Sequence, residues 1–336
     1  MSNTILLAHG SGGQLSHDLV AEVFAASFAN PVLERLEDSA VLAGLGGGRL
    51  AFTTDSYVVR PLFFPGGDIG RLAVCGTIND LAMSGAQPRY LSAAFVIEEG
   101  LPIADLRRIV RSMAETAREA GVAIVTGDTK VVERGHGDGC FITTAGIGVI
   151  PAGVDISAAN ARPGDAVLVS GTVGDHGMAI MSQREGLRFE AEIASDVAPL
   201  HTLVRAMLEV CPQIHCLRDP TRGGLATTLN ELAGQSAVEI VVEEACIPVR
   251  PAVQSLGELL GIDPLYVANE GKLVAIVPEE AAGQVLAVMK AHPLGRDAAI
   301  IGHVRSGRAG RVSLRTTLGA HRILDMMVGE LLPRIC

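Results

Sequence analysis

Residues 50–97 carry the sequence LAFTTDSYVVRPLFFPGGDIGRLAVCGTINDLAMSGAQPRYLSAAFVI, in which strand and helix patterns alternate. Residues 50–59 follow a glycine-rich turn and predict a strand. A helix is predicted over 68–83, with Asp68 as its N-cap and Gly85 as its stop. A further strand is predicted over 89–97. Strand, helix and strand in this order are typical of an α/β protein.

The same alternation continues along the chain. A helix over 102–120 is expected to end at Gly121, with strands over 122–125 and 140–150 after it. A linker is predicted at 151–163, because turn-forming residues replace periodic ones there. Beyond it the patterns predict a strand, a helix, two strands and a helix, at 166–170, 224–233, 238–242, 273–277 and 279–291.

Length and composition favour two domains. At 336 residues the chain is longer than one hydrophobic core usually supports. Hydrophobic residues make up 48% of the chain but aromatic residues only 3%, so an aliphatic core is expected. We place the domains at 1–155 and 160–320. A mobile tail at 321–336 is expected to begin with a short helix at His321.

Charge and cysteine usage indicate which partners and which cellular compartment to expect. The net charge of −10 disfavours nucleic acid as a partner, because such binders need clustered basic residues. No apolar run approaches the ~20 residues needed to span a membrane. Scattered cysteines in a long chain without a signal peptide indicate a reducing, cytoplasmic setting. Cys211 and Cys216 are expected to be ordinary thiols, because a second pair of metal ligands is missing.

The chain ends in Pro333-Arg334-Ile335-Cys336, which places a thiol behind a proline that stops any preceding helix. A terminal cysteine has few flanking contacts, and chain ends are usually mobile. The pattern favours a reactive thiol on a moving tail. The alternative is a reducible end cysteine without a function.

Aspartates recur where predicted strands or helices meet loops, at Asp38, Asp55, Asp80 and Asp128. Carboxylates that repel one another are costly unless a cation neutralises them. Hard oxygen ligands of this kind suit Mg²⁺ held between protein and phosphates. The alternative is four unrelated caps or turns.

A glycine-rich loop, His9-Gly10-Ser11-Gly12-Gly13, precedes a helical stretch. Its backbone N–H groups could cradle anionic oxygens, although a flexible N-terminal loop would have the same sequence. Gly271-Lys272 is followed by Leu273, so no P-loop is completed, and no G-x-G-x-x-G follows a strand. ATP would therefore bind by another architecture.

Ten motifs follow one another in the order HGSGG, EDSA, TTDS, NDLAMSGA, TGDTKVV, RPGD, SGTVGDHG, RDPTRGGLA, ANEGK and PRIC. This order resembles the HypE family of hydrogenase maturation factors, a branch of the aminoimidazole ribonucleotide synthetase-like (PurM-like) ATP-dependent enzymes. The resemblance runs from about His9 to Cys336. The aspartate and glycine motifs identify the superfamily, whereas TGDTKVV, GDHG, NEGK and PRIC are specific to the HypE branch.

The resemblance implies two PurM-like α/β domains, a homodimer whose N-terminal mixed sheets form a barrel, and a flexible tail. It also implies ATP and Mg²⁺ in a cleft. In that family the terminal cysteine, here Cys336, receives a carbamoyl group from the carbamoyltransferase HypF. ATP then drives dehydration of the thiocarboxamide to a thiocyanate. The cyano group passes through the HypC–HypD complex to the iron of [NiFe] hydrogenase.

The resemblance also implies roles for single residues. Glu270 in ANEGK is the candidate base for the carboxamide nitrogen, and Lys130 would orient or polarise the reacting groups. Without the resemblance they would be read as a turn carboxylate and a surface charge. His176 is expected to be structural near the cleft. Nucleotide contacts are assigned to Gly10, Gly12, Gly13, Asp38, Asp55, Asn79, Asp80, Asp128 and Asp219, with Asp38, Asp55, Asp80 and Asp128 also holding Mg²⁺.

Two other functions share part of this pattern. One is another PurM-like enzyme, such as a selenophosphate synthetase or a thiamine phosphate kinase. A selenophosphate synthetase would be expected to carry its reactive residue in the N-terminal glycine loop, where this chain has His9-Gly10-Ser11 and no cysteine. The other is a non-catalytic carrier of a modified tail cysteine, which would release no phosphate.

Overall fold

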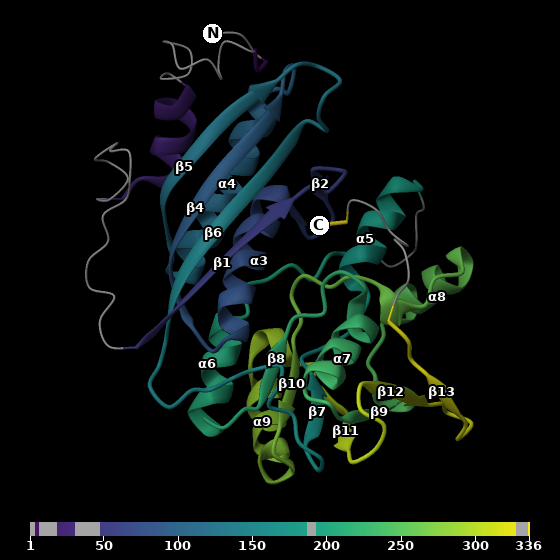
Figure 1. Ribbon diagram of the computed structural model, residues 1–336. Helices are drawn as coiled ribbons and strands as arrows, with labels where there is room; N and C mark the ends of the chain where they lie inside the picture. Colours follow the sequence, from purple (N-terminus) through teal and green to yellow (C-terminus); the bar gives the residue numbers. More distant parts are fainter. Residues whose placement is uncertain (1–3, 7–18, 31–47, 187–192, 327–334) are drawn as a thin grey trace.

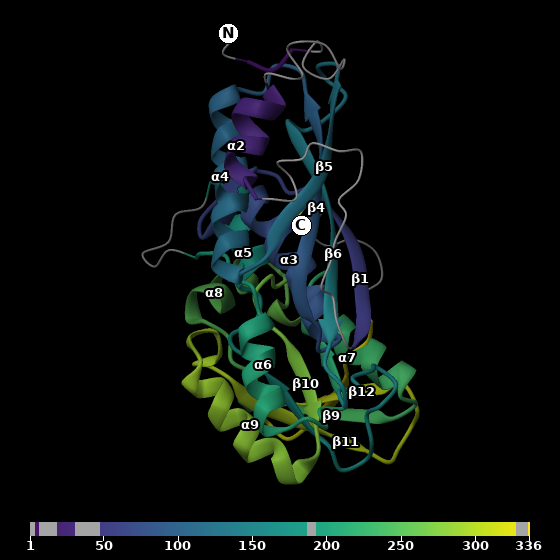
Figure 2. The ribbon, with the colours of Figure 1, turned by 90° about the vertical axis from the view of Figure 1, so that its left-hand side faces the viewer.

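The computed structural model describes residues 4–6, 19–30, 48–186, 193–326 and 335–336. It shows two α/β units stacked along the long axis of the molecule (Figure 1, Figure 2). A four-stranded sheet forms the first unit and a seven-stranded sheet the second. This confirms the predicted α/β class, with one large sheet on each side of the linker and a two-stranded sheet, β2-β3, in the first unit.

The first sheet is mixed and has the strand order β1-β6-β4-β5. Strand β6 is antiparallel to β1 and β4, and β5 is parallel to β4. Two helices, α3 (Ile69–Met83) and α4 (Ile103–Ala120), cover one face of this sheet (Figure 2). The strands are β1 (Arg49–Tyr57), β4 (Gln87–Glu98), β5 (Ala123–Val132) and β6 (Cys140–Ile150).

Both helices begin and end where the sequence predicts. The Asp68 side chain caps α3 by accepting hydrogen bonds from the N–H groups of Gly70 and Arg71, at 2.8 and 3.0 Å. Helix α4 ends at Gly121, whose φ of 69° lies in the left-handed region that glycine adopts without strain. Its core-facing residues recur at helical spacing and are Leu106, Ile109, Val110, Met113 and Ala117.

The second sheet has the order β13-β12-β9-β11-β7-β10-β8. Its strands are β7 (Ala166–Val169), β8 (Cys216–Arg218), β9 (Glu239–Glu243), β10 (Val274–Val277), β11 (Ala299–Arg305), β12 (Arg311–Arg315) and β13 (His321–Ile323). Its helices are α5 (Asp175–Arg184), α6 (His201–Val210), α7 (Gly224–Gln235), α8 (Pro251–Leu260) and α9 (Glu279–Ala291).

Helices cover both faces of the second sheet. Val167 and Val169 of β7 share a buried cluster with residues of α7. Ala166 and Leu168 share another with α6 and α9. Strands β7 and β10 are therefore buried on both faces, which explains their continuous apolar sequences AVLV and VAIV.

Shorter elements connect the main ones. They are η2 (Val20–Ala25), α2 (Ala26–Phe28), β2 (Phe63–Phe64), β3 (Gly67–Asp68), η4 (Glu244–Cys246), η5 (Pro264–Tyr266) and η6 (Pro293–Gly295). Residues 151–165 form turns and irregular backbone, as predicted for the linker. Within the described ranges, no helix has the length and apolar character that a membrane crossing needs.

Two sequence-based expectations are wrong. Strand β5 continues past the predicted end at residue 125 to Val132, because its Gly127 and Asp128 pair with Ala93 and Ala94 of β4 despite their low strand propensity. Asp128 therefore lies inside a strand rather than at its end. The helix expected from His321 is instead strand β13, which pairs with the edge strand β12. The rest of the tail, 327–334, lies outside the described residues.

Candidate active site at the junction of the two units

The carboxyl end of the chain lies at the junction of the units, beside β2 and α5 (Figure 1). Ile335 is 4% exposed and packs into the hydrophobic core of the first unit. Nε2 of His176 donates a hydrogen bond to the carbonyl of Ile335 at 2.8 Å, and the N–H of Val58 donates to the Cys336 oxygen at 3.3 Å. The structure thus describes a docked position for the tail; its predicted movement stays a prediction.

Cys336 docks beside Glu270, the predicted base. Glu270 is 3% exposed, and its Oε1 has no hydrogen-bond partner among the described residues. A buried oxygen without a partner is costly in a folded protein unless a ligand or reaction uses it. The thiol and the Glu270 carboxyl group are the central pair of the candidate site.

Two side chains fix the backbone around Glu270. Asp196 accepts hydrogen bonds from the N–H groups of Glu270 and Gly271, both at 3.1 Å. Asn79 of α3 donates to the carbonyls of Glu270 and Ala198, at 3.2 and 3.1 Å. Its amide oxygen accepts from the N–H of Leu200 at 2.8 Å. Asn79, predicted to contact nucleotide, therefore has its amide engaged in joining the two units.

Carboxylates crowd one side of Glu270. Burial raises its pKa well above the usual range, and the negative charges of Asp219, Asp196, Asp55 and Asp80 raise it further. Burial and the charge of Asp80 also raise the pKa of Asp219, to about 7. Burial and Asp55 raise that of Asp80. The structure thus brings Asp55, Asp80, Asp219 and Glu270 together, and their predicted roles in binding and catalysis stay predictions.

The environment of the docked thiol suppresses its ionisation. Burial raises the pKa of Cys336 far above its ordinary value, and the Glu270 carboxylate adds to the effect, while Arg222 opposes it. A thiolate next to a carboxylate would be strongly disfavoured. The docked Cys336 is therefore a neutral thiol near pH 7.

A cation lies next to the carboxylate that holds the Glu270 backbone. Nζ of Lys272 lies 3.0 Å from Oδ2 of Asp196 and 3.8 Å from Oδ2 of Asp175. Burial alone would raise the pKa of Asp196, but the charge of Lys272 and the hydrogen bonds from Lys272 and the Glu270 backbone reverse the balance and lower it. Asp196 is therefore ionised and able to hold the loop of Glu270. Gly271 is required there, because a Cβ would lie 1.8 Å from the Asp196 carbonyl oxygen.

Lys130 and Asp128 do not join this site within one chain. Asp55 of β1 pairs with Thr144, which is buried against α3, whereas Asp128 pairs with Ala94 on the face away from the helices. The two aspartates also lie on opposite edge strands of the first sheet. Lys130 Nζ instead pairs with Asp128 at 2.8 Å, with both side chains more than half exposed. The sequence predicts Asp55 and Asp128 at element ends, but Asp55 lies inside β1 and Asp128 inside β5, and the sequence alone cannot show which sheet face each occupies.

Predicted contacts at Gly10, Gly12, Gly13 and Asp38 lie outside the described residues. Within the residues that are described, no group of three or more His, Cys, Asp or Glu side chains could hold a metal ion. Asp55 and Asp80 still fit Mg²⁺ shared with phosphates, because such an ion needs only one or two protein carboxylates. The remaining cysteines form no disulfide with one another.

Sequence reasoning missed Asp196 and the contact of His176 with the tail. Asp196 lies in an irregular segment far along the chain from Glu270, so no local spacing connects the two. His176 lies in the first turn of α5, which begins at Asp175. Its partner at Ile335 arises only from the tertiary fold.

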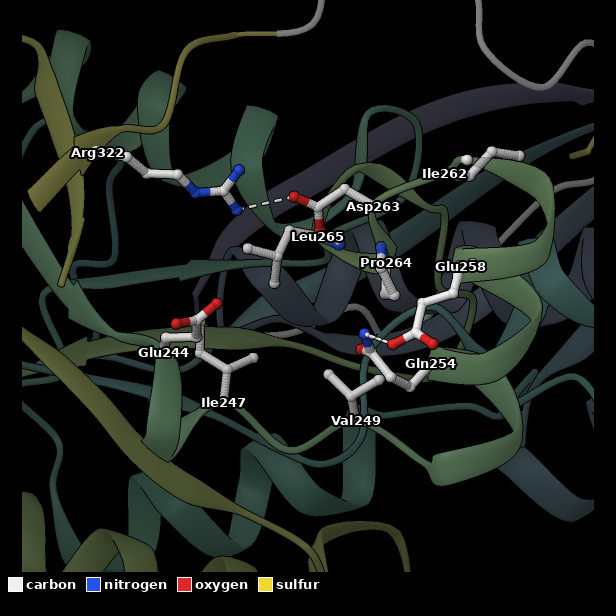
Figure 3. Close-up of a pocket in the computed structure, with 12 residues that line it drawn as sticks. Glu244, Ile247, Val249, Gln254, Glu258, Ile262, Asp263, Pro264, Leu265 and Arg322 are labelled. Carbon is white, nitrogen blue, oxygen red and sulfur yellow. Dashed lines mark hydrogen bonds and ion pairs between the residues drawn. The ribbon is translucent and has the colours of Figure 1, made fainter. Parts of the chain in front are cut away.

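A separate cavity of about 490 Å³ lies in the second unit between α8, η5 and β13 (Figure 3). Four of its polar side chains form two pairs. Arg322 Nη2 lies 2.8 Å from Asp263 Oδ2, and Gln254 donates to Glu258 at 3.0 Å. Its described lining contains none of the predicted site residues.

The fold is that of an AIR synthase-related protein. Models of the N-terminal and C-terminal domains of "AIR synthase related protein" match residues 36–150 and 162–315. Carbamoyl dehydratase HypE of Cupriavidus necator is 58% identical over 335 residues, which cover 100% of this chain and 95% of that protein. The chain therefore belongs to the HypE family.

Solved structures agree. The hydrogenase maturation protein HypE in complex with ATP is 54% identical, with a TM-score of 0.96 over 99% of this chain and 100% of that chain. HypE in a HypE–HypF complex is 52% identical, with a TM-score of 0.81 over 92% of this chain and 99% of that chain. The family resemblance inferred from the motifs is confirmed.

Proposed function

We propose that this chain is an ATP-dependent carbamoyl dehydratase that converts an S-carboxamide on its own Cys336 into a thiocyanate. The proposal rests on the Cys336 thiol docked beside Glu270, a buried carboxylate whose Oε1 has no partner among the described residues. Relatives named carbamoyl dehydratase HypE support it. The product would supply the cyano ligand for the iron of [NiFe] hydrogenase.

The reaction removes the carboxamide oxygen and both hydrogens of its nitrogen. The oxygen attacks the γ-phosphorus of ATP, a new P–O bond forms, and the bond to the β-phosphate breaks to release ADP. Glu270 accepts one N–H proton as the nitrogen electron pair forms the second C–N bond. The electron pair of the remaining N–H bond then forms the third C–N bond as the C–O bond breaks, and phosphate leaves with the C–O electron pair and takes up the last proton. A carboxylate with a raised pKa is a stronger base for this role once ionised.

Loading of the thiol requires a different position of the tail. A thiolate is the nucleophile in carbamoyl transfer, and the docked thiol is neutral because burial and Glu270 raise its pKa. Cys336 would therefore accept its carbamoyl group outside the junction. A solved HypE–HypF complex supports HypF as the donor. Delivery of the cyano group to the HypC–HypD complex follows from the family resemblance.

ATP as the phosphoryl donor is supported by the solved HypE relative in complex with ATP. Asp55 and Asp80 would hold Mg²⁺, which would offset the negative charge of the phosphates. The side chain of Asp80 already accepts a hydrogen bond from Thr53 at 2.8 Å, which fixes its direction. Further nucleotide contacts are proposed for Gly10, Gly12, Gly13, Asp38 and Asp219.

Lys130 and Asp128 enter the proposal through the homodimer. The sheet face that carries them also exposes apolar side chains, with Phe52 72% and Val96 38% exposed. Such a face would be covered if two sheets closed into a barrel. Closure would place the β5 edge of one subunit beside the β1 edge of the other. Lys130 would then act on the tail of the second subunit.

Intact-protein mass spectrometry tests the dehydration. The chain is incubated with the carbamoyltransferase, carbamoyl phosphate and ATP, and then ATP is withheld in a parallel sample. We expect a carbamoyl adduct on Cys336 in both samples and loss of one water from it only with ATP. A carrier without activity would keep the adduct unchanged, and Cys336→Ala would gain no adduct.

Mixed dimers test the placement of Lys130. Cys336→Ala and Lys130→Ala are each expected to be inactive as homodimers. If Lys130 acts across the interface, a mixture that exchanges subunits regains dehydration, because one junction then holds an intact tail and an intact lysine. A mixture as inactive as its parents would contradict action in trans.

A further inference from the structure

His176 occupies a buried position between the tail and the second unit. It lies in the first turn of α5 and is fully buried. Its Nδ1 lies 2.7 Å from the hydroxyl of Ser195, and its Nε2 lies 2.8 Å from the carbonyl oxygen of Ile335. Phe64 packs edge-on against the ring, with centroids 5.5 Å apart. Both ring nitrogens and one ring face are therefore engaged.

These partners define one state of the ring. A carbonyl oxygen can only accept, so Nε2 carries the hydrogen. The N–H of Val197 donates to the Ser195 oxygen at 3.1 Å, which leaves the Ser195 hydroxyl hydrogen free to point at Nδ1. Burial lowers the pKa of His176 and favours the neutral ring. The donor that faces the tail is thus fixed by the protein.

The same segment serves the tail and the base. Ser195 orients His176, and the adjacent Asp196 holds the backbone of Glu270 and Gly271. Ser195 is itself fixed, because its N–H donates to the carbonyl of Pro65 at 2.8 Å. Residues 195–196 therefore help to fix the positions of both the tail and the base.

We infer that His176 is a positioning residue that latches the tail in the junction through the Ile335 carbonyl and so sets the approach of Cys336 to Glu270. The side chain of Ile335 contributes an apolar anchor, since it is 4% exposed within the first core. The latch itself does not depend on ATP or on a modified thiol. Its consequence for dehydration rests on the proposed function.

Thiol alkylation measures the latch directly. Cys246 is exposed and the four cysteines other than Cys246 and Cys336 are buried, so in a Cys246→Ser background a reagent reports on Cys336. We expect His176→Leu, which lacks the donor, to be alkylated roughly fivefold to tenfold faster than its parent, as loss of one buried hydrogen bond implies. His176→Gln retains an N–H donor and should stay near the parent rate. The readout is the mass of the intact protein over time.

A purely structural role predicts another pattern. It would make the buried Cys75 and Cys140 reactive together with Cys336, whereas the latch predicts acceleration at Cys336 alone. Equal rates in the leucine variant and its parent would overturn the inference. If His176→Leu does not fold, Ser195→Ala decides: a roughly twofold acceleration supports the latch, and an unchanged rate rejects it. The assay contains no ATP, so its failure would leave the dehydratase proposal intact.

Discussion

Two groups of carboxylates near Glu270 differ in how their negative charges are balanced. We call Asp196 and Asp175 the balanced side, and Asp55, Asp80 and Asp219 the unbalanced side. On one side Lys272 lies within 4 Å of Asp196 and Asp175 and the pKa of Asp196 is lowered. On the other side, Asp55, Asp80 and Asp219 form no ion pair with any described residue, and the pKa values of Asp80 and Asp219 are raised. Glu270 is influenced by both groups, because Asp196 of the first and Asp55, Asp80 and Asp219 of the second all raise its pKa.

The two groups have different roles: one supports the backbone around Glu270, and the other is where we expect a ligand to bind. On the balanced side, the Asp196 carboxylate holds the backbone of Glu270 and Gly271 by accepting hydrogen bonds from their N–H groups. The unbalanced side keeps carboxylates whose repulsion a bound cation would relieve. Such strain persists in a folded protein where a ligand or a reaction uses it. The unbalanced side is therefore where we expect Mg²⁺ and phosphate.

The largest effect is expected at the boundary between the two sides. Glu270→Gln removes the base and keeps the shape, so dehydration should fall by about 10³-fold or more. The carboxamide should accumulate on Cys336, as seen in the intact mass. Glu279→Gln, at an exposed position of α9, is the control and should leave conversion unchanged. Normal turnover by the Glu270 variant would exclude the residue as the base.

Loss of the cation on the balanced side should cost stability. Lys272→Met leaves Asp196 and Asp175 buried without their partner, and we expect the free energy of unfolding to fall by about 3–5 kcal/mol. Urea unfolding measures the change. The control, Lys290→Met, alters an exposed lysine at the end of α9 and should shift stability by less than about 0.5 kcal/mol. If the two variants lost similar free energy of unfolding, the buried ion pairs of Lys272 would contribute no more to stability than an exposed lysine.

Repulsion on the unbalanced side should make stability fall as pH rises. Folded Asp219 keeps its proton to about pH 7, whereas in the unfolded chain the group ionises near pH 4. Between these values the folded state binds more protons, so raising the pH through this window lowers the free energy of unfolding. After allowance for partial exposure we expect about 2 kcal/mol. Denaturation midpoints near pH 5 and pH 8 should differ less for Asp219→Asn.

The exposed pair on the outer sheet face provides the smallest effect. Lys130 and Asp128 are 64% and 62% exposed, and water screens their attraction. Lys130→Met should change the free energy of unfolding by less than about 1 kcal/mol. Thermal unfolding measures this against the Lys272 variant. A loss as large as that of Lys272→Met would mean that the outer face is buried, as in the proposed barrel.

Most of the fold could be predicted from local patterns. The caps at Asp68 and Gly121 and the fully apolar strands β7 and β10 follow from backbone and burial rules that act over a few residues. The extension of β5 and the edge strand β13 could not, because pairing with β4 and β12 overrides the weak propensity of their own residues.

The site divides in the same way. Asp55, Asp80, Asp219 and Glu270 stand in recognisable motifs, and the structure brings them together. The opposite face taken by Asp128 depends on strand register, which a one-residue slip would reverse. Asp196 stands in no motif and reaches Glu270 only because the units fold against each other. Spacing along the chain carries no information about such contacts.

Asn79 of α3 is 1% exposed and joins the two units. Its amide nitrogen donates to the carbonyls of Ala198 and Glu270, and its amide oxygen accepts from the N–H of Leu200. Parting the halves would strand these polar groups without water, so a hinge there is unfavourable. The predicted movement of the tail would therefore have to occur without separation of the two units at Asn79.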